Sequence, residues 1–467
     1  MRFWLTLIAL FALAATPFIS LRGHSPVAVV AAGSPAPQNL EILQEYLDPA
    51  PRGMDVRYCW DLPGGRGENV RIVDIEINWN LNHNDLVEAT SNTFLLMRGV
   101  DPQPDVHIDH GTAVLGELVA APDGIGVTGI AHRASLGLIN PAFDGTALRV
   151  AEAVRQATRR LSAGDVILIE QQSLAGPRLD INTGRGLVPI EFEPDVFDAI
   201  QDATLRGITV IEPAANGSDD LDHPAYGGRF DRNQRDSGAI IVGSGMPPDD
   251  IFGQGPDRAR TDESNYGSRV DVQGWGRAIA TCGFGDLLNG QGKNNLYTSQ
   301  FGATSGAAAM VAGAVALIQS IMKERGLAPL TPAQLRRLLI ATGSPQQGDL
   351  SKPIGPRPDL RAALELLFSD HADLVPVITS VKHKKAKGRL IIEGANFIAN
   401  DSIVEVNQVA VPRVKYPADY ILPGGVSFLV KTKGNINSML PRGQEVSITI
   451  FTPSTGNRSQ AFRLLIK

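Results

Sequence analysis

Residues 302–313 read Gly-Ala-Thr-Ser-Gly-Ala-Ala-Ala-Met-Val-Ala-Gly, and they constrain the fold more than any other stretch of the chain. A turn-prone tripeptide leads to Ser305, and the small residues after it open an apolar run that continues through Ile321. This pattern predicts a tight turn that feeds a buried helix. A serine at such a helix start is either a cap or a hydroxyl held at an exposed corner, where free N–H groups favour negative charge.

Two upstream stretches favour the second interpretation of Ser305. Residues 70–74, Val-Arg-Ile-Val-Asp, predict an apolar strand that ends in the carboxylate of Asp74. His110 is followed by Gly-Thr-Ala-Val and opens a second small-residue helix. A serine hydroxyl is a poor nucleophile near neutral pH unless an imidazole takes its proton and a carboxylate orients that imidazole. The order Asp, His, Ser therefore points to nucleophilic catalysis.

A fourth segment follows a predicted strand at 208–211 and contains Asn216. Together the segments resemble the motifs of the subtilisin-like serine peptidases, and the resemblance covers roughly residues 55–365. In chain order, the segments that carry it are His110-Gly-Thr112, Ala214-Ala-Asn216-Gly217, Thr304-Ser305 and Val311-Ala-Gly313.

The resemblance implies hydrolysis of peptide bonds in protein or peptide substrates. It makes Ser305 the nucleophile and His110 the general base and acid. It makes Asp74 the carboxylate that orients the imidazole, and Asn216 a donor to the developing oxyanion. One departure stands beside Asp74, because the family usually has a small residue and a glycine where Ile75 and Glu76 stand here. Glu76 either perturbs Asp74 or faces solvent.

The segment Ser173, Leu174, Ala175 and Gly176 resembles the family's stretch that pairs with the substrate backbone. The alternative is an edge loop. Three acidic residues that follow Asn216, namely Asp219, Asp220 and Asp222, are either specificity determinants for basic side chains or exposed loop acids.

The family resemblance also implies a structural calcium ion. Asp85 and Asp123 match the two parts of the family's usual site and would supply hard oxygen ligands. The alternative is two unrelated turn aspartates. No catalytic cofactor is expected.

The order of the predicted elements gives the fold class. From residue 70 to about residue 341, short apolar strands alternate with helical patterns, so we expect an α/β fold with a doubly wound, mainly parallel sheet. After residue 373 the pattern changes to short alternating runs separated by turns, which predicts an antiparallel β-sandwich. Residues 376–467 resemble the immunoglobulin-like IPT/TIG modules.

The N-terminus predicts export. Arg2 precedes an apolar run that is too short for a comfortable membrane span, so we expect a signal peptide at 1–23, or alternatively an uncleaved anchor. The expected organisation continues with a linker and N-terminal extension at 24–54, a peptidase domain at 55–368 and the sandwich at 376–467. The protein is then secreted or periplasmic, without a membrane span in the mature chain. Export permits a disulfide between Cys59 and Cys282, but two free thiols are equally consistent with the sequence.

Charge divides the chain unevenly. The whole chain has 43 basic and 49 acidic residues, a net charge of −6, which does not indicate a nucleic-acid binder. Residues 376–467 hold 13 basic and 5 acidic residues, a net charge of +8, which leaves −14 for the remainder. The basic module is expected either to contact an anionic cell surface or merely to guard a sheet edge with solvated lysines. The alternative to an enzyme is a binding protein on a non-catalytic subtilase scaffold, targeted by the sandwich.

Overall fold

The computed structural model describes residues 38–101, 103–145, 147–253, 255–288, 292–368 and 374–467. The chain divides into two compact units. The first runs up to Pro332 and resumes over Gly343–Leu360, and the second comprises Ala333–Thr342 and Arg361–Lys467. The expected signal peptide at 1–23 lies outside the described residues, as does the expected linker up to residue 37.

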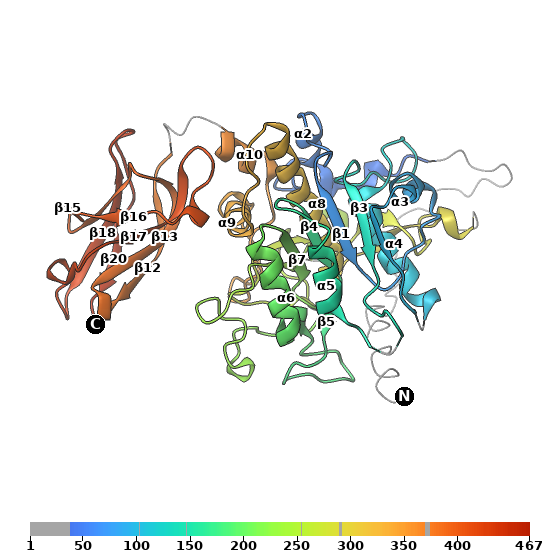
Figure 1. The fold of residues 1–467 in the computed structure, drawn as a ribbon, viewed down its shortest axis with the longest axis horizontal. Helices are drawn as coiled ribbons and strands as arrows, with labels where there is room; N and C mark the ends of the chain where they lie inside the picture. Colours follow the sequence, from blue (N-terminus) through green and yellow to red (C-terminus); the bar gives the residue numbers. More distant parts are fainter. Residues whose placement is uncertain (1–37, 102, 146, 254, 289–291, 369–373) are drawn as a thin grey trace. The chain divides into compact units, whose positions relative to one another are not determined.

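A seven-stranded parallel sheet is the centre of the first unit (Figure 1), which confirms the expected doubly wound α/β fold. Six of the strands are short and almost entirely buried, as a sheet covered on both faces requires, whereas the edge strand Leu95–Met97 is partly exposed. In spatial order the strands are β2 (Leu95–Met97), β3 (Ser135–Ile139), β1 (Arg71–Ile75), β4 (Val166–Ile169), β7 (Thr209–Pro213), β8 (Ile240–Gly245) and β9 (Val272–Trp275).

Helices cover both faces of this sheet. On one face, α5 (Val150–Thr158) and α6 (Pro194–Leu205) pack over a core that includes Ile167 and Val210. On the other face, α4 (Pro104–Val119) packs against α8 (Ala303–Glu324), and α8 lies along β7, β8 and β9. Helix α8 is long and apolar enough to cross a membrane, but its most apolar stretch is wholly buried, so it is the core helix of this unit.

Shorter elements complete the first unit. They are α2 (Val56–Trp60), α3 (Val87–Ser91), α7 (Asp249–Phe252), the hairpin β10 (Ile279–Cys282) and β11 (Tyr297–Phe301), and the pair β5 (Gln172–Ser173) and β6 (Val188–Pro189). Cys59 and Cys282 are both buried, and no disulfide joins them in the structure.

The second unit contains α9 (Pro332–Thr342) from Ala333 onward, all of α10 (Leu360–Phe368) but its first residue, and the expected antiparallel sandwich. Residues such as Leu390, Ile392 and Val430 are buried between two sheets, and in Arg389–Ile398 the residues beside Leu390 and Ile392 are less buried. One sheet contains β12 (Val377–Lys384), β13 (Arg389–Ile398), β17 (Val426–Thr432) and β16 (Val414–Lys415). The other contains β15 (Val409–Ala410), β14 (Ile403–Val406), β18 (Glu445–Thr452), β19 (Asn457–Arg458) and β20 (Phe462–Leu465).

Candidate active site

A tight turn places Ser305 near the start of α8. The helix begins at Ala303, directly after Gly302. Ala303 has a φ of 57°, in the left-handed region that a residue with a Cβ rarely adopts. Its N–H donates to the carbonyl of Gly276 at 2.8 Å, and a Cβ at Gly302 would lie 2.3 Å from the same oxygen. The backbone before Ser305 is therefore closely packed and fixed in position.

His110 contacts a carboxylate at one ring nitrogen. It lies in the second turn of α4, which begins six residues earlier than the sequence pattern indicated. Its Nδ1 is 2.5 Å from Oε2 of Glu76, whose side chain is 2% exposed. The other oxygen of Glu76 accepts the N–H of Ile77 at 2.6 Å. A carboxylate at Nδ1 fixes the tautomer in which Nε2 can accept a proton.

The structure differs from the sequence interpretation at Asp74. This side chain is fully buried, and its Oδ2 accepts the indole N–H of Trp79 at 2.7 Å. Asp74 pairs with Leu168 inside the sheet, one position short of the last residue of β1. Glu76 lies just past the strand end, where side chains of parallel strands reach the active-site edge. The carboxylate at His110 is therefore Glu76, two residues beyond the one that the sequence motif suggested.

Asn216 connects the carboxyl end of β7 to the start of α8. Its Oδ1 accepts hydrogen bonds from the N–H and the hydroxyl of Thr304, at 3.2 and 2.7 Å. Its backbone N–H donates to Oε1 of Gln172 at 3.0 Å. These contacts fix the amide orientation, because the oxygen is engaged and the Nδ2 hydrogens are the remaining donors. The residue before Ser305 thus aligns the side chain that was expected to serve the oxyanion.

A family model described as the subtilase family matches residues 66–356, more than half of the chain. The chain belongs to the subtilase family. Members of this family are serine endopeptidases that act on protein or peptide substrates, so the chain is assigned to that class of hydrolase. None of the curated proteins compared with the chain matches it.

Several solved structures are similar to this subtilase. The prenylagaramide maturation protease PagA is 19% identical, with a TM-score of 0.49 over 68% of this chain and 99% of that chain. The epidermin leader peptide processing serine protease of Staphylococcus aureus is 19% identical, with a TM-score of 0.48 over 71% and 82%. The psychrophilic subtilisin-like protease Apa1 of Pseudoalteromonas sp. AS-11 is 13% identical, with a TM-score of 0.45 over 65% and 94%.

The segment expected to bind substrate is partly engaged within the subtilase itself. Ser173 is buried, pairs with Val188 of β6, and donates its hydroxyl to Oε1 of Glu193 at 2.6 Å. Leu174 is half-buried and Ala175 is exposed, whereas Gly176 is buried. At the end of the segment, a Cβ at Gly176 would lie 2.5 Å from the carbonyl oxygen of Gly186, so the backbone is closely packed there. The exposed part of the segment is thus confined to its middle.

The three acids after Asn216 have partners in the chain. Asp219 is buried, forms an ion pair with Arg178 at 2.9 Å, and accepts the hydroxyl of Tyr226. Asp220 accepts the N–H of Asp222 at 2.9 Å. Asp222 accepts the N–H and the hydroxyl of Ser268 at 2.7 and 2.6 Å. The Arg178 contact gives the buried Asp219 carboxylate a cationic partner within the chain.

The two expected calcium ligands have hydrogen-bond partners within the chain. Asp85 is buried, and its oxygens accept the hydroxyl of Tyr297 at 2.5 Å and the N–H of Val127 at 2.8 Å. Asp123 is exposed and accepts the N–H of Ile125 at 2.9 Å. Among the described residues, there is no group of three or more His, Cys, Asp or Glu side chains that could hold a metal. Calcium takes six to eight oxygen ligands, so backbone carbonyls and water would have to complete a shell begun by these two aspartates.

Two further carboxyl groups lie at the site, and sequence reasoning gave neither a role. Glu170 follows β4 and Glu117 lies in α4, and both side chains are fully buried. Burial raises the pKa of each well above the usual value for glutamate. The sequence does contain a signal for Glu170, because this charged residue directly follows the apolar run 166–169.

Proposed function

We propose that this subtilase is a secreted serine endopeptidase whose triad is Ser305, His110 and Glu76. The contact between His110 Nδ1 and Glu76 Oε2 carries the proposal. His110 takes the proton of the Ser305 hydroxyl as that oxygen attacks the scissile carbonyl, and later gives it to the leaving amine. Glu76 keeps the imidazole in the required tautomer and stabilises the imidazolium. Asn216 donates an amide hydrogen to the oxyanion.

The longer glutamate side chain compensates for its position past the strand end. Aspartate at position 74 lies inside the sheet, and its carboxylate is held by Trp79. Glu76 approaches from the loop after β1, and the N–H of Ile77 fixes one of its oxygens. The second oxygen is then directed to the ring of His110.

A fluorophosphonate probe tests the triad, because it labels an activated serine. Ser305→Ala and His110→Ala are each expected to abolish labelling and nearly all peptide hydrolysis, since nucleophile and base act as one unit. Asn216→Ala is expected to keep slow labelling and to reduce turnover about a hundredfold or more. Unchanged hydrolysis by pure Ser305→Ala would overturn the assignment. Absence of labelling in the folded wild type would favour the binding-protein alternative.

The chain offers a matched control on the same helix. Nδ1 of His107 lies 2.7 Å from Oδ1 of Asp101, so this buried histidine also contacts a carboxylate. It lies three residues, almost one turn, before His110 and is not part of the proposed triad. His107→Ala is therefore expected to keep labelling within a few-fold in the folded protein. This comparison separates loss of the base from the general cost of removing a histidine from α4.

We also propose export, which the signal-peptide pattern at 1–23 supports. N-terminal sequencing of protein recovered from the periplasm or the medium tests this proposal.

The calcium expectation stays a prediction, and no catalytic step depends on the ion. The IPT/TIG resemblance of residues 376–467 likewise stays a proposal, supported by the two antiparallel sheets of the second unit.

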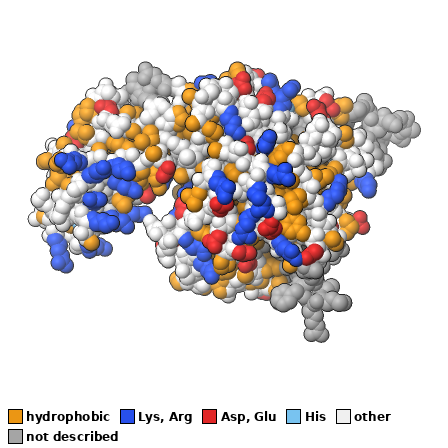
Figure 2. All heavy atoms as spheres, viewed as in Figure 1, with side chains coloured by type: hydrophobic (Ala, Val, Ile, Leu, Met, Phe, Trp, Pro, Cys, Tyr) orange, Lys and Arg blue, Asp and Glu red, His pale blue; other side chains and the backbone are white. Residues whose placement is uncertain are grey.

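We further propose that one face of the second unit binds an anionic phospholipid surface. Ile391 of β13 pairs with Lys382 on one side and with Lys431 on the other. Lys431 in turn pairs with Lys415 of β16. Paired residues in a sheet project from the same face, so these lysines form a row across four strands. The next pair, Lys384 and Arg389, extends the row. Figure 2 shows Lys and Arg side chains gathered over this unit.

Charge complementarity supports a flat anionic partner. The neighbouring residues Leu390, Ile392 and Val430 are buried in the sandwich, so the cations occupy the outward face. Glu393 is an acid on this face, and it lies 3.8 Å from Lys382. A planar row of positive charges fits a bilayer rich in phosphatidylglycerol, with each lysine near the surface contributing about 1 kcal/mol.

Vesicle co-sedimentation of the full chain tests this contact. The triple variant Lys382→Gln, Lys415→Gln, Lys431→Gln is expected to lose at least tenfold in affinity for phosphatidylglycerol–phosphatidylcholine vesicles. The matched variant Arg442→Gln, Arg463→Gln, Lys467→Gln removes the same charge elsewhere in the module and is expected to lose less. Equal losses, or binding to soluble polyphosphate but not to vesicles, would contradict the membrane assignment.

A further inference from the structure

The register of β1 and β4 gathers carboxyl groups beneath the nucleophile. Ile75 pairs with Ile169, so the next residues, Glu76 and Glu170, lie at the same level. The N–H of Glu170 donates to the carbonyl of Ile75 at 3.1 Å, which continues the parallel ladder by one residue. Asp74 is two residues before Glu76. Because side chains alternate along a strand, all three carboxyls project from one face, opposite to Ile75 and Ile169.

That face is the one covered by α4 and α8. Ile75 and Ile169 belong to the core beneath α5 and α6, so the acids point to the other side. Helix α4 adds Glu117, seven residues after His110. A Cβ at Gly306 would lie 3.3 Å from Oε1 of Glu117, so this carboxyl lies beside the residue that follows Ser305.

The surroundings of Glu170 favour the protonated form of its carboxyl, because they raise its pKa. Burial is the largest cause that raises its pKa. The charges of Glu76, Asp74 and, more weakly, Glu117 raise it further. The Ser305 hydroxyl from α8 acts in the opposite direction and lowers it. On the neighbouring strand β7, Glu212 lies at the level of Ile169. Its side chain therefore faces the side of the sheet opposite to Glu170. The groups that act on Glu170 are thus three carboxyls and the nucleophile.

Neither oxygen of Glu170 forms a hydrogen bond of standard geometry with a described residue. The Ser305 hydroxyl nevertheless interacts with the carboxyl closely enough to lower its pKa. Catalytic hydrogen bonds are often long or poorly aligned in an enzyme without substrate and tighten in the complex. The position of Glu170 therefore suits a group that engages Ser305 during catalysis.

We propose that Glu170 is a fourth catalytic residue, which in its protonated form donates its O–H to Oγ of Ser305. This inference rests on the proposed triad. With that donor in place, the hydrogen of Ser305 is left for Nε2 of His110. During attack the Ser305 proton passes to His110 and then to the leaving amine, and Glu170 keeps its own proton. An ionised Glu170 instead accepts the Ser305 hydrogen and competes with His110 for it.

The proposal predicts a specific pH dependence. The labelling rate of the wild type by a fluorophosphonate should fall toward alkaline pH as Glu170 ionises, by about tenfold per pH unit. Glu170→Gln keeps a permanent N–H donor and should retain the plateau rate within about threefold, without the alkaline fall. Glu117→Gln is the matched control, because it removes another buried carboxyl of the cluster and should keep that fall.

A second variant tests the donor itself. Glu170→Leu has a similar volume and no donor, and replacing a buried carboxyl by an apolar group need not impair folding. It should lower kcat and the labelling rate at least tenfold with little change in KM, whereas Glu170→Gln should restore both. Wild-type activity in Glu170→Leu, or an equal loss in Glu170→Gln, overturns the proposal. So does an alkaline fall that persists in Glu170→Gln or is missing in the wild type.

These outcomes are distinct from failure of the triad. If Ser305→Ala retains hydrolysis, the proposed function itself is wrong. If Ser305→Ala is inactive while Glu170→Gln and Glu170→Leu both match the wild type, only the role of Glu170 is wrong. Should Glu170→Leu fail to fold, the alkaline limb of Glu170→Gln alone decides.

Discussion

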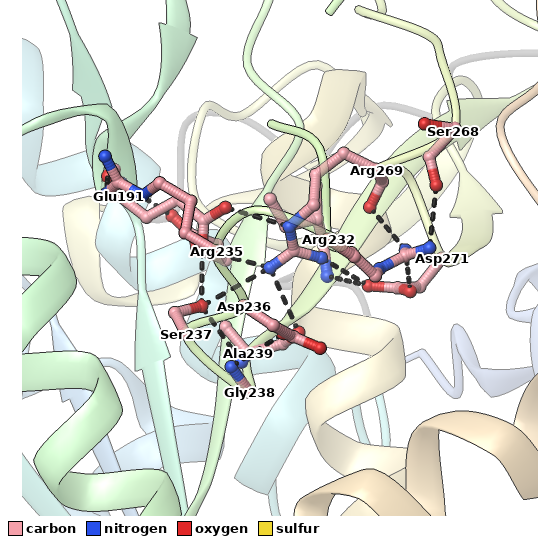
Figure 3. Close-up of polar contacts among 12 residues, drawn as sticks. Glu191, Arg232, Arg235, Asp236, Ser237, Gly238, Ala239, Ser268, Arg269 and Asp271 are labelled. Atoms are coloured by element: carbon pink, nitrogen blue, oxygen red, sulfur yellow. Dashed lines mark hydrogen bonds and ion pairs between the residues drawn. The ribbon is translucent and has the colours of Figure 1, made fainter. Parts of the chain in front are cut away.

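Two clusters of buried carboxyl groups in the peptidase unit are built in opposite ways. In the first, Arg269 is 1% exposed and contacts two acids (Figure 3). Its guanidinium donates to both oxygens of Glu191, at 2.8 and 3.0 Å, and to Oδ2 of Asp271 at 2.8 Å. Arg232 also pairs with Asp271, and Ser237 donates to Glu191. Burial raises the pKa of Glu191, but the charge and hydrogen bonds of Arg269 outweigh it, and the net pKa is lowered.

In the second cluster, beneath Ser305, carboxyls face other carboxyls. Burial and the charge of Glu76 raise the pKa of Asp74, and the same two causes lead for Glu170. The arginine-centred cluster holds β9 and the segments around Glu191 and Ser237 together with fixed charges. The active-site cluster holds groups that can gain or lose protons at the site of chemistry. Charge compensation therefore distinguishes the structural cluster from the functional one.

The largest expected effect comes from the carboxyl of the second cluster that contacts His110. Glu76→Gln should lower kcat by about 10⁴, because an amide at Nδ1 favours the wrong imidazole tautomer. The melting temperature should change little, since no buried charge is left without a partner. Activity assays and thermal unfolding on the same preparation check both. A decrease of less than tenfold would show that the contact with His110 is not catalytic.

Breaking the first cluster should instead reduce stability. Arg269→Met leaves Glu191 and Asp271 buried without their central cation and should cost about 3–5 kcal/mol in the free energy of unfolding. The kcat of the molecules that remain folded should be unchanged. Urea unfolding measures the loss, and the Arg269→Met, Glu191→Gln double variant should recover part of it. A loss of kcat without a loss of stability would reverse the roles assigned to the two clusters.

Asp85 is an intermediate case, with hydrogen-bond donors and no cation. Burial is the main cause that raises its pKa from 3.8 to about 6. Folding thus favours the protonated form, so its stabilisation is fully present below pH 3.8 and is lost as the pH rises through about 6. The difference corresponds to on the order of 3 kcal/mol.

Urea unfolding between pH 4 and pH 7 tests this dependence, because that range includes the pKa of Asp85 in the folded protein, about 6. Asp85→Asn should be less stable overall, because its amide nitrogen cannot accept the N–H of Val127, but it should lack this component of the pH dependence. Asp123→Asn, at an exposed position, is the control. Calcium that stabilises the wild type but not Asp85→Asn would support the calcium expectation instead.

The smallest effect is expected at Asp74. Asp74→Asn keeps an oxygen that can accept the indole N–H of Trp79 and should change kcat by no more than about threefold. The family resemblance assigned Asp74 to His110 and thus predicted a severe loss. The ratio of the Asp74→Asn and Glu76→Gln rates decides which acid belongs to the triad.

Much of the fold follows from local patterns in the sequence. Apolar runs such as 166–169 predict buried strands, and the small residues after Ser305 predict the core helix α8. Both elements occur where they were expected, because each is fixed by hydrophobic periodicity. The motif residues His110, Asn216 and Ser305 could likewise be named in advance, and the structure links Asn216 to the start of α8.

Local patterns could not decide which carboxylate contacts His110. Asp74 and Glu76 are two residues apart and their side chains project from the same face of the sheet, so periodicity treats them alike. Only the end of the β1 ladder and the packing of α4 separate them: Trp79 holds the first, and His110 contacts the second. The partner of Asp219 and the position of Glu170 beneath Ser305 were equally hidden, because each depends on contacts between segments distant in sequence. The sequence by itself determined the strands, the helices and the chemical groups available. The tertiary structure decided which groups meet, because register and helix packing set side-chain distances.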